Sequence, residues 1–306
     1  MPVADVIERH RAAGREFEAG GVQSFVREAG SGQAVVCVHG VPSSSFLYRK
    51  VNDELAARGL RGVAFDLPGL GLAERPEDYD YTWTGLGRFA IAAVDALGLD
   101  RFHLVVHDIG GPVGFELAAA MPERVQSLTV LNTMVEVDTF RRPWMMRPFA
   151  QRGIGELWLA SMGGPAFREL MYYSAIADRS SVTNDEVAAY VKLLKRGDRG
   201  RAFLKIMRGF ELTREKRDLY VGVLRDRRYP VQVVWGAQDP TLTLKREGEA
   251  ARAAAQAEAI HTLPAKHYPQ EDQAPAIAAL VSQIADAGLP DTKGHDTGPF
   301  TEPASA

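Results

Sequence analysis

Three side chains that could serve as nucleophile, acid and base follow apolar runs of the sequence. Asp108 closes FHLVVHD, Asp239 follows VQVVWG, and His267 follows HTLPAK. This chain order is the one used when a sharp strand-to-helix turn exposes a nucleophile. A carboxylate at such a turn can attack an electrophilic sp³ carbon, and a histidine can then activate the water that cleaves the resulting ester. The alternative role for Asp108 is to cap the helix that follows it.

The elements that must position these residues alternate between strand and helix. A hairpin is expected at residues 14–30. Apolar, strand-like runs occur at residues 33–40, 61–69, 102–108, 127–133, 229–240 and 259–272. Stretches with helical spacing occur at residues 45–59, 84–97, 110–125, 245–257 and 275–288. The alternation predicts an α/β fold with a mostly parallel, doubly wound sheet, whose carboxyl edge would gather the polar residues.

The alternation stops between residues 134 and 218, where helical stretches rich in Trp, Met, Tyr and Arg replace it. We expect residues 1–133 and 219–288 to form the α/β core. Residues 134–218 would form an all-helical cap, or lid, inserted after the sixth strand. The tail at 289–306 is polar and rich in Gly, Pro and Thr, so we expect it to be disordered.

Composition excludes several other classes of protein. The 306 residues carry a formal net charge of -3, so no basic excess would attract nucleic acid or an anionic membrane. We find no apolar run long enough to span a bilayer, no secretory h-region, and no Cys/His spacing typical of a metal site. The single cysteine, Cys37, lies in the apolar run AVVCV. These features predict a cytoplasmic enzyme that needs no cofactor or metal.

Four segments together resemble α/β-hydrolases of the branch that uses an aspartate nucleophile, which includes epoxide hydrolases and haloalkane dehalogenases. They are HGVPSSSFLYRKV, FDLPGLGLAERP, VVHDIGGPVG and KHYPQEDQAPAIA, and the resemblance covers about residues 15–288. It implies the α/β-hydrolase fold and a triad in which Asp108 is the nucleophile, His267 the base and Asp239 the acid that orients it. Dimers are common for this fold, so a homodimer is an expectation by analogy.

The resemblance also assigns the turn HGVP. His39, Gly40 and Pro42 would shape the turn, with Pro42 in the cis form. The backbone N–H groups of Val41 and Ile109 would form an oxyanion hole for the attack of water on the ester. Some haloalkane dehalogenases carry the acid after the preceding strand instead, which makes Glu136 the alternative to Asp239.

The leaving group separates the two subfamilies. Dehalogenases usually bind the halide through side chains at the positions of Val41 and Ile109, which cannot donate here, although Trp144 or Trp158 could supply one donor. Epoxide hydrolases protonate the alkoxide with two cap tyrosines. The residues that could do so, unless they only pack, are Tyr172, Tyr173 and Tyr190. We therefore expect opening of an epoxide in a small apolar substrate ahead of dehalogenation. A ligand-binding or biosynthetic accessory protein is the alternative from another class.

Overall fold

The computed structural model describes residues 2–226 and 228–287, which form an eight-stranded sheet with helices on both faces. The sheet order is β1-β2-β4-β3-β5-β6-β7-β8. Strands β1 and β2 run antiparallel, as do β2 and β4, and the remaining neighbours are parallel. The strands are β1 (Gly14–Ala19), β2 (Val22–Ala29), β3 (Ala34–Val38), β4 (Arg61–Phe65), β5 (Phe102–Asp108), β6 (Val125–Thr133), β7 (Val231–Gly236) and β8 (His261–Leu263). The predicted α/β class with a mostly parallel sheet is confirmed.

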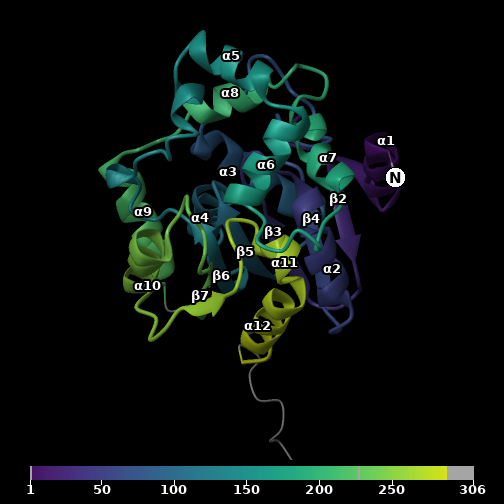
Figure 1. Ribbon diagram of the computed structural model, residues 1–306. Coiled ribbons are helices and arrows are strands. Elements are labelled where there is room, and N and C mark those ends of the chain that lie inside the picture. The colour runs from purple at the N-terminus through teal and green to yellow at the C-terminus, as the bar shows by residue number, and fades with distance from the viewer. Residues whose placement is uncertain (1, 227, 288–306) are drawn as a thin grey trace, which may run out of the picture.

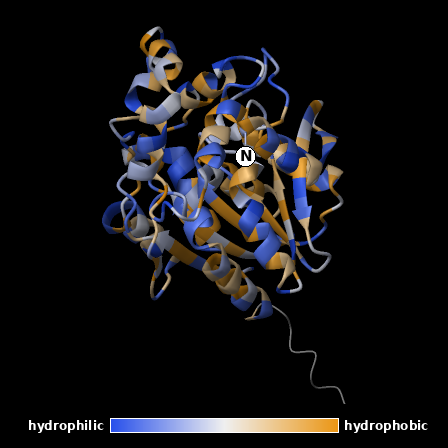
Figure 2. Ribbon diagram, turned by 45° about the vertical axis from the view of Figure 1, so that its right-hand side comes forward, coloured by the Kyte–Doolittle hydropathy of each residue, from blue (hydrophilic) through white to orange (hydrophobic). Residues whose placement is uncertain are grey.

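Successive residues of the central strands face opposite helical layers, because side chains alternate along a strand. In β3, Val36 and Val38 pack with the layer that contains α3 (Trp83–Ala96), α4 (Gly110–Ala120), α9 (Arg214–Leu224) and α10 (Glu249–Ala255). Val35 and Cys37 pack on the other side, with α1 (Val3–Ala12), α2 (Arg49–Ala56) and α12 (Ala274–Ala287). Burial on both faces explains the continuous apolar runs, which are visible as orange strands through the middle of the molecule in Figure 2.

The chain between β6 and β7 is helical, and its described residues form no strand. It contains the short helices η2 (Val137–Thr139) and η3 (Arg147–Ala150), then α5 (Ile154–Ser161), α6 (Gly164–Ser174), α7 (Asn184–Leu194), α8 (Arg201–Arg208) and α9. We call residues 134–208 the helical insertion. Its helices α5 to α8 gather at one end of the molecule, opposite α12 (Figure 1).

Helix α9 departs from the expected boundary at residue 218, which falls inside it. It packs beside α4 and α10. Lys216 reaches Glu116 of α4 at 2.6 Å, and the hydroxyl of Tyr220 donates to the same carboxylate at 3.1 Å. These contacts tie α9 to the helices of the sheet, a long-range pairing that periodicity along the chain cannot reveal.

The remaining short elements are η1 (Ser45–Tyr48), the π-helix η4 (Leu244–Gly248) and α11 (Pro269–Asp272). None of the described helices is both long and apolar enough to cross a membrane. The predicted tail at 289–306 lies outside the described residues.

Candidate active site

Asp108 ends β5 in a backbone conformation that places its carboxylate at the edge of the sheet. Its φ is 54°, in the left-handed region that non-glycine residues seldom adopt, and α4 begins two residues later at Gly110. Such strain in a non-glycine residue is typical of functional turns. The neighbouring turn must come close, and Gly40 allows it: a Cβ there would lie 2.2 Å from Asp108 Oδ1.

Backbone donors from two turns converge on this carboxylate. The N–H of Val41 donates to Asp108 Oδ1 at 2.8 Å, and the N–H of Ile109 also hydrogen-bonds the carboxylate. The Val41–Pro42 peptide is cis. The structure therefore brings the Val41 amide to Oδ1 of Asp108 and the Ile109 amide to the same carboxylate, where charge would develop when water attacks an ester.

His39 lies within the same turn and is fully buried. Its Nε2 accepts from the N–H of Leu67 at 3.0 Å, so its Nδ1 carries the proton and donates to the Gly40 carbonyl at 2.9 Å. Burial lowers the pKa of His39. A neutral ring with both nitrogens occupied holds the turn in shape and has no free position for proton transfer.

His267 connects Asp108 to Asp239. Its Nε2 lies 3.4 Å from Asp108 Oδ2, and its Nδ1 donates to Asp239 Oδ2 at 2.8 Å. Asp239 is fixed through its other oxygen, which accepts from the backbone N–H and the hydroxyl of Thr241, both at 2.7 Å, and from the N–H of Leu242 at 3.0 Å. This fixes the orientation of the ring and directs Nε2 at the carboxylate of Asp108.

Asn132, near the end of β6, is a member of the site that the sequence analysis missed. Its Nδ2 donates to Asp239 Oδ2 at 2.8 Å, and its Oδ1 accepts from the N–H of Gly236 at 2.8 Å. It has a φ of 24° and is fully buried. The available signal was its place at the carboxyl end of the strand SLTVLNT, where polar residues of a parallel sheet meet.

The charges of Asp108, His267 and Asp239 depend on one another. Burial opposes ionisation of Asp108, but the hydrogen bond and charge of His267 hold its pKa below the usual range. Burial likewise opposes the charged form of His267, yet Asp239 and Asp108 raise its pKa to about 10. The neighbouring His107 has its pKa lowered to about 3 by burial and by His267. At neutral pH the resting site thus holds an imidazolium between two carboxylates.

An apolar cavity opens over Asp108 and His267. Most of its wall comes from the helical insertion. The apolar side chains from that segment are Met134, Phe140, Pro143, Met145, Met146, Phe149, Trp158, Met162, Phe167, Leu170, Met171, Ala175 and Met207. The polar ones are Arg142 and Ser174. Its mostly apolar lining suits a small apolar molecule. In the described part of the chain, no cluster of His, Cys, Asp or Glu is arranged to hold a metal ion.

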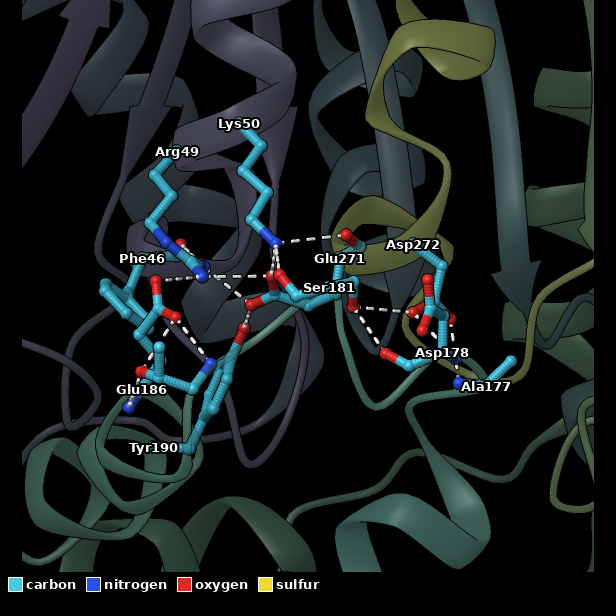
Figure 3. A network of polar contacts seen from close by, with 11 residues as sticks. Phe46, Arg49, Lys50, Ala177, Asp178, Ser181, Glu186, Tyr190, Glu271 and Asp272 are labelled. Atoms are coloured by element: carbon cyan, nitrogen blue, oxygen red, sulfur yellow. Dashed lines mark hydrogen bonds and ion pairs between the residues drawn. The ribbon is translucent and has the colours of Figure 1, made fainter.

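The three tyrosines expected as donors do not reach this cavity. Tyr190 is buried, and its hydroxyl donates to Glu271 at 2.5 Å, within the network of polar contacts shown in Figure 3. The hydroxyl of Tyr172 donates to Asn184 at 3.3 Å, and Tyr173 is 58% exposed. The structure therefore does not bring these three hydroxyls to Asp108: those of Tyr172 and Tyr190 have other partners, and Tyr173 is exposed.

The tryptophans and the alternative acid also lie apart from the reacting groups. Trp158 lines the cavity, but its indole N–H donates to the Met145 carbonyl at 3.2 Å, and Trp144 is 60% exposed. Glu136 is exposed and has no contact with His267. Of the two acid candidates, the structure brings Asp239 to the histidine.

Known proteins similar to this chain share its fold. A family model described as alpha/beta hydrolase fold matches residues 33–274, and the chain therefore belongs to the α/β-hydrolase family. An epoxide hydrolase from Vigna radiata superposes with a TM-score of 0.73 at 23% identity, covering 90% of this chain and 98% of the other. A haloalkane dehalogenase from Bradyrhizobium elkani does so with a TM-score of 0.72 at 22% identity, covering 90% and 99%.

Two further relatives are similar in sequence. An uncharacterised hydrolase of Saccharomyces cerevisiae is 26% identical over 235 residues, which are 72% of this chain and 78% of that protein. A cis-3-alkyl-4-alkyloxetan-2-one decarboxylase of Shewanella oneidensis is 34% identical over 170 residues, 53% of this chain and 50% of that protein.

Proposed function

We propose that this hydrolase attacks an sp³ carbon with the carboxylate of Asp108, displaces an oxygen leaving group from a strained ring, and hydrolyses the ester that forms. The observation that carries the proposal is the geometry of Asp108. One carboxylate oxygen is bound to the Val41 N–H at 2.8 Å, and the other lies 3.4 Å from His267 Nε2 at the base of an apolar cavity. A carboxylate with a lowered pKa is ionised at neutral pH and can act as a nucleophile.

The ester of Asp108 would be cleaved by water at its carbonyl carbon. Val41 and Ile109 would donate to the oxyanion, and His267 would take the proton of the water. His267 cannot do this in the resting site, because the two carboxylates keep it protonated. Esterification removes the charge of Asp108, which lowers the pKa of His267 and lets Nε2 become the base. The helical insertion would act as the cap that keeps bulk water from the ester.

An oxygen leaving group fits the site better than a halide. Val41 and Ile109 present apolar side chains, and the indole of Trp158 already has a partner, so a halide would find no side-chain donor of the expected kind. Opening an epoxide creates an alkoxide that needs one proton, and His267 must release one proton when the ester forms. The proton balance therefore closes for an epoxide, and the product after hydrolysis is a diol.

Opening of a β-lactone is the second candidate, favoured by the similarity to the oxetan-2-one decarboxylase. Attack of Asp108 on the sp³ ring carbon that is bonded to the ring oxygen would release a carboxylate, and a carboxylate needs no proton donor. This suits a cavity that the three tyrosine hydroxyls do not reach. The similarity covers about half of each chain, so this candidate ranks second.

Trapping the ester in His267→Gln tests the proposal. The variant is incubated with a styrene-type epoxide, a bromoalkane of equal size and a cis-dialkyl β-lactone, and its intact mass is measured. We expect an adduct with the epoxide that forms slowly, because solvent must replace His267 as the proton source, but that reaches one per chain. It should map to Asp108 by peptide sequencing and be missing in Asp108→Asn/His267→Gln. Adduct formation by the bromoalkane together with bromide release by the wild type would reject the oxygen leaving group. No adduct with any compound would reject the nucleophile.

A further inference from the structure

Arg142 is a positively charged side chain in an otherwise mostly apolar cavity. It lies between η2 and η3 and lines the same cavity as Asp108 and His267. Its Nη2 donates to the Met207 carbonyl at 3.0 Å, and its guanidinium carbon lies 4.6 Å from the ring centre of Phe210. Among the described residues, no carboxylate lies within ion-pair distance of it.

The guanidinium is left with unused donors. Its Nε is buried and has no hydrogen-bond partner. Only one of its five N–H groups, on Nη2, has an assigned acceptor. Burial lowers the pKa of Arg142, and no carboxylate offsets this effect, although an arginine stays charged in any protein environment. A buried donor without a partner is costly, and an anion bound to it would remove that cost.

Arg49 is an example of a guanidinium in this protein that has a structural role and forms ion pairs with carboxylates. Arg49 contacts Glu271 at 2.6 Å and Glu186 at 2.9 Å, and it also lies over the ring of Phe46 (Figure 3). Arg142 has the corresponding aromatic contact with Phe210 but lacks any carboxylate. The comparison leaves Arg142 as a partly buried guanidinium that lines the cavity without a carboxylate partner among the described residues.

We propose that Arg142 binds a carboxylate of the substrate. The stacked ring and the Met207 carbonyl hold the guanidinium plane, and the planar carboxylate matches its N–H fork. A phosphate is a poorer match, because its higher charge would meet one cation and a wall of methionine and phenylalanine side chains. The inference rests on the proposed function, since it names the substrate class of the same site.

The carboxylate can come from two sources. It can already be present in the substrate, as in an epoxy acid. It can also form in the reaction when a β-lactone opens. In that step an oxygen of Asp108 bonds to the ring carbon, the bond from this carbon to the ring oxygen breaks, and the electron pair stays on the oxygen as a carboxylate. Either source delivers the same group to the guanidinium.

Binding of inert acids tests the site without catalysis. Binding of hexanoate and phenylacetate, measured by titration calorimetry, is compared with binding of the corresponding amides in the wild type, Arg142→Lys and Arg142→Met. We expect the wild type to prefer each acid by about 5-fold or more, the fold-change that matches a partly exposed ion pair. Arg142→Met should lose this preference and Arg142→Lys should keep part of it. Equal binding of acid and amide by the wild type would overturn the proposal, whether or not the variants fold.

Turnover separates the two sources of the carboxylate. For an epoxy acid, kcat/KM should fall about 5-fold or more in Arg142→Met, while kcat/KM for a neutral epoxide of equal size should change little. If kcat/KM of Arg142→Met fell selectively for a neutral β-lactone, Arg142 would instead bind the carboxylate that the reaction releases. Equal changes for all three substrates would refute the proposal. Adduct formation by the neutral epoxide in Arg142→Met/His267→Gln reports on Asp108 separately, so failure of the nucleophile and failure of Arg142 are distinguishable.

Discussion

Because His267 holds a proton in the folded enzyme, the free energy of unfolding should depend on pH between about pH 7 and pH 8.5, where few other groups titrate. Its folded pKa is about 10, against an ordinary value of 6.5. Because the folded pKa is raised, the stabilisation is complete below the unfolded pKa and is lost as the pH rises toward 10. Other buried histidines (His10, His39, His103 and His107) have lowered pKa values and are neutral above about pH 7.5 in both states.

The magnitude follows from the number of protons bound. Above the unfolded pKa, the folded chain binds one proton more than the unfolded chain, so the free energy of unfolding falls by about 1.4 kcal/mol per pH unit. Between about pH 7 and pH 8.5 the expected loss is about 2 kcal/mol, allowing for partial protonation of the unfolded chain. Above this window Cys37 adds a loss of its own, because burial raises the pKa of its thiol.

The assay is denaturant unfolding of the wild type and of His267→Gln at several pH values inside this window, with the free energy extrapolated to water. The glutamine variant keeps both carboxylates but cannot take up the proton, so its stability should be nearly independent of pH here. The measured quantity is the difference between the two slopes. Equal slopes would mean that His267 is neutral in the resting enzyme, and the assignment of an imidazolium between two carboxylates would be refuted.

Three further substitutions test other contacts of the site. Gly40→Ala should lower kcat/KM by about 100-fold, because the added Cβ would lie 2.2 Å from Asp108 Oδ1 and would force the carboxylate to move. Circular dichroism checks that the fold is intact, and unchanged kinetics would contradict this geometry. Asn132→Ala should make the ester of Asp108 accumulate in rapid-quench experiments, because Asp239 loses a hydrogen-bond donor and orients His267 less well for hydrolysis. If ester formation and ester hydrolysis slowed equally, this role of Asn132 would be contradicted. Tyr190→Phe should cost about 1–3 kcal/mol in denaturant unfolding, because Glu271 stays buried with one donor fewer. A loss of kcat at unchanged stability would instead place that hydroxyl in the chemistry.

The residues at the carboxyl edge of the sheet can be predicted from the sequence, because each follows directly after an apolar run. An apolar run shows where a strand ends, and the ends of parallel strands meet at one edge, so Asp108, Asp239 and His267 could be expected together. The donors of the helical insertion could not be predicted in this way. The direction of Tyr190 depends on Glu271, 81 residues away, and on the ion pairs that hold that carboxylate. The place of Arg142 could not be predicted for the same reason, because its contacts with Met207 and Phe210 join distant segments.

In the mechanism proposed above, the contacts of His267 also determine the order of the two chemical steps. While Asp108 is a carboxylate, it helps to keep the imidazole protonated, so the base is unavailable and the nucleophile stays ionised. When Asp108 becomes an ester, one of the two charges that hold the proton disappears. The remaining carboxylate, Asp239, accepts from Nδ1 at 2.8 Å and keeps the proton on that nitrogen. The proton that leaves is therefore the one on Nε2, which faces the new ester, and the base appears only where and when water must be activated.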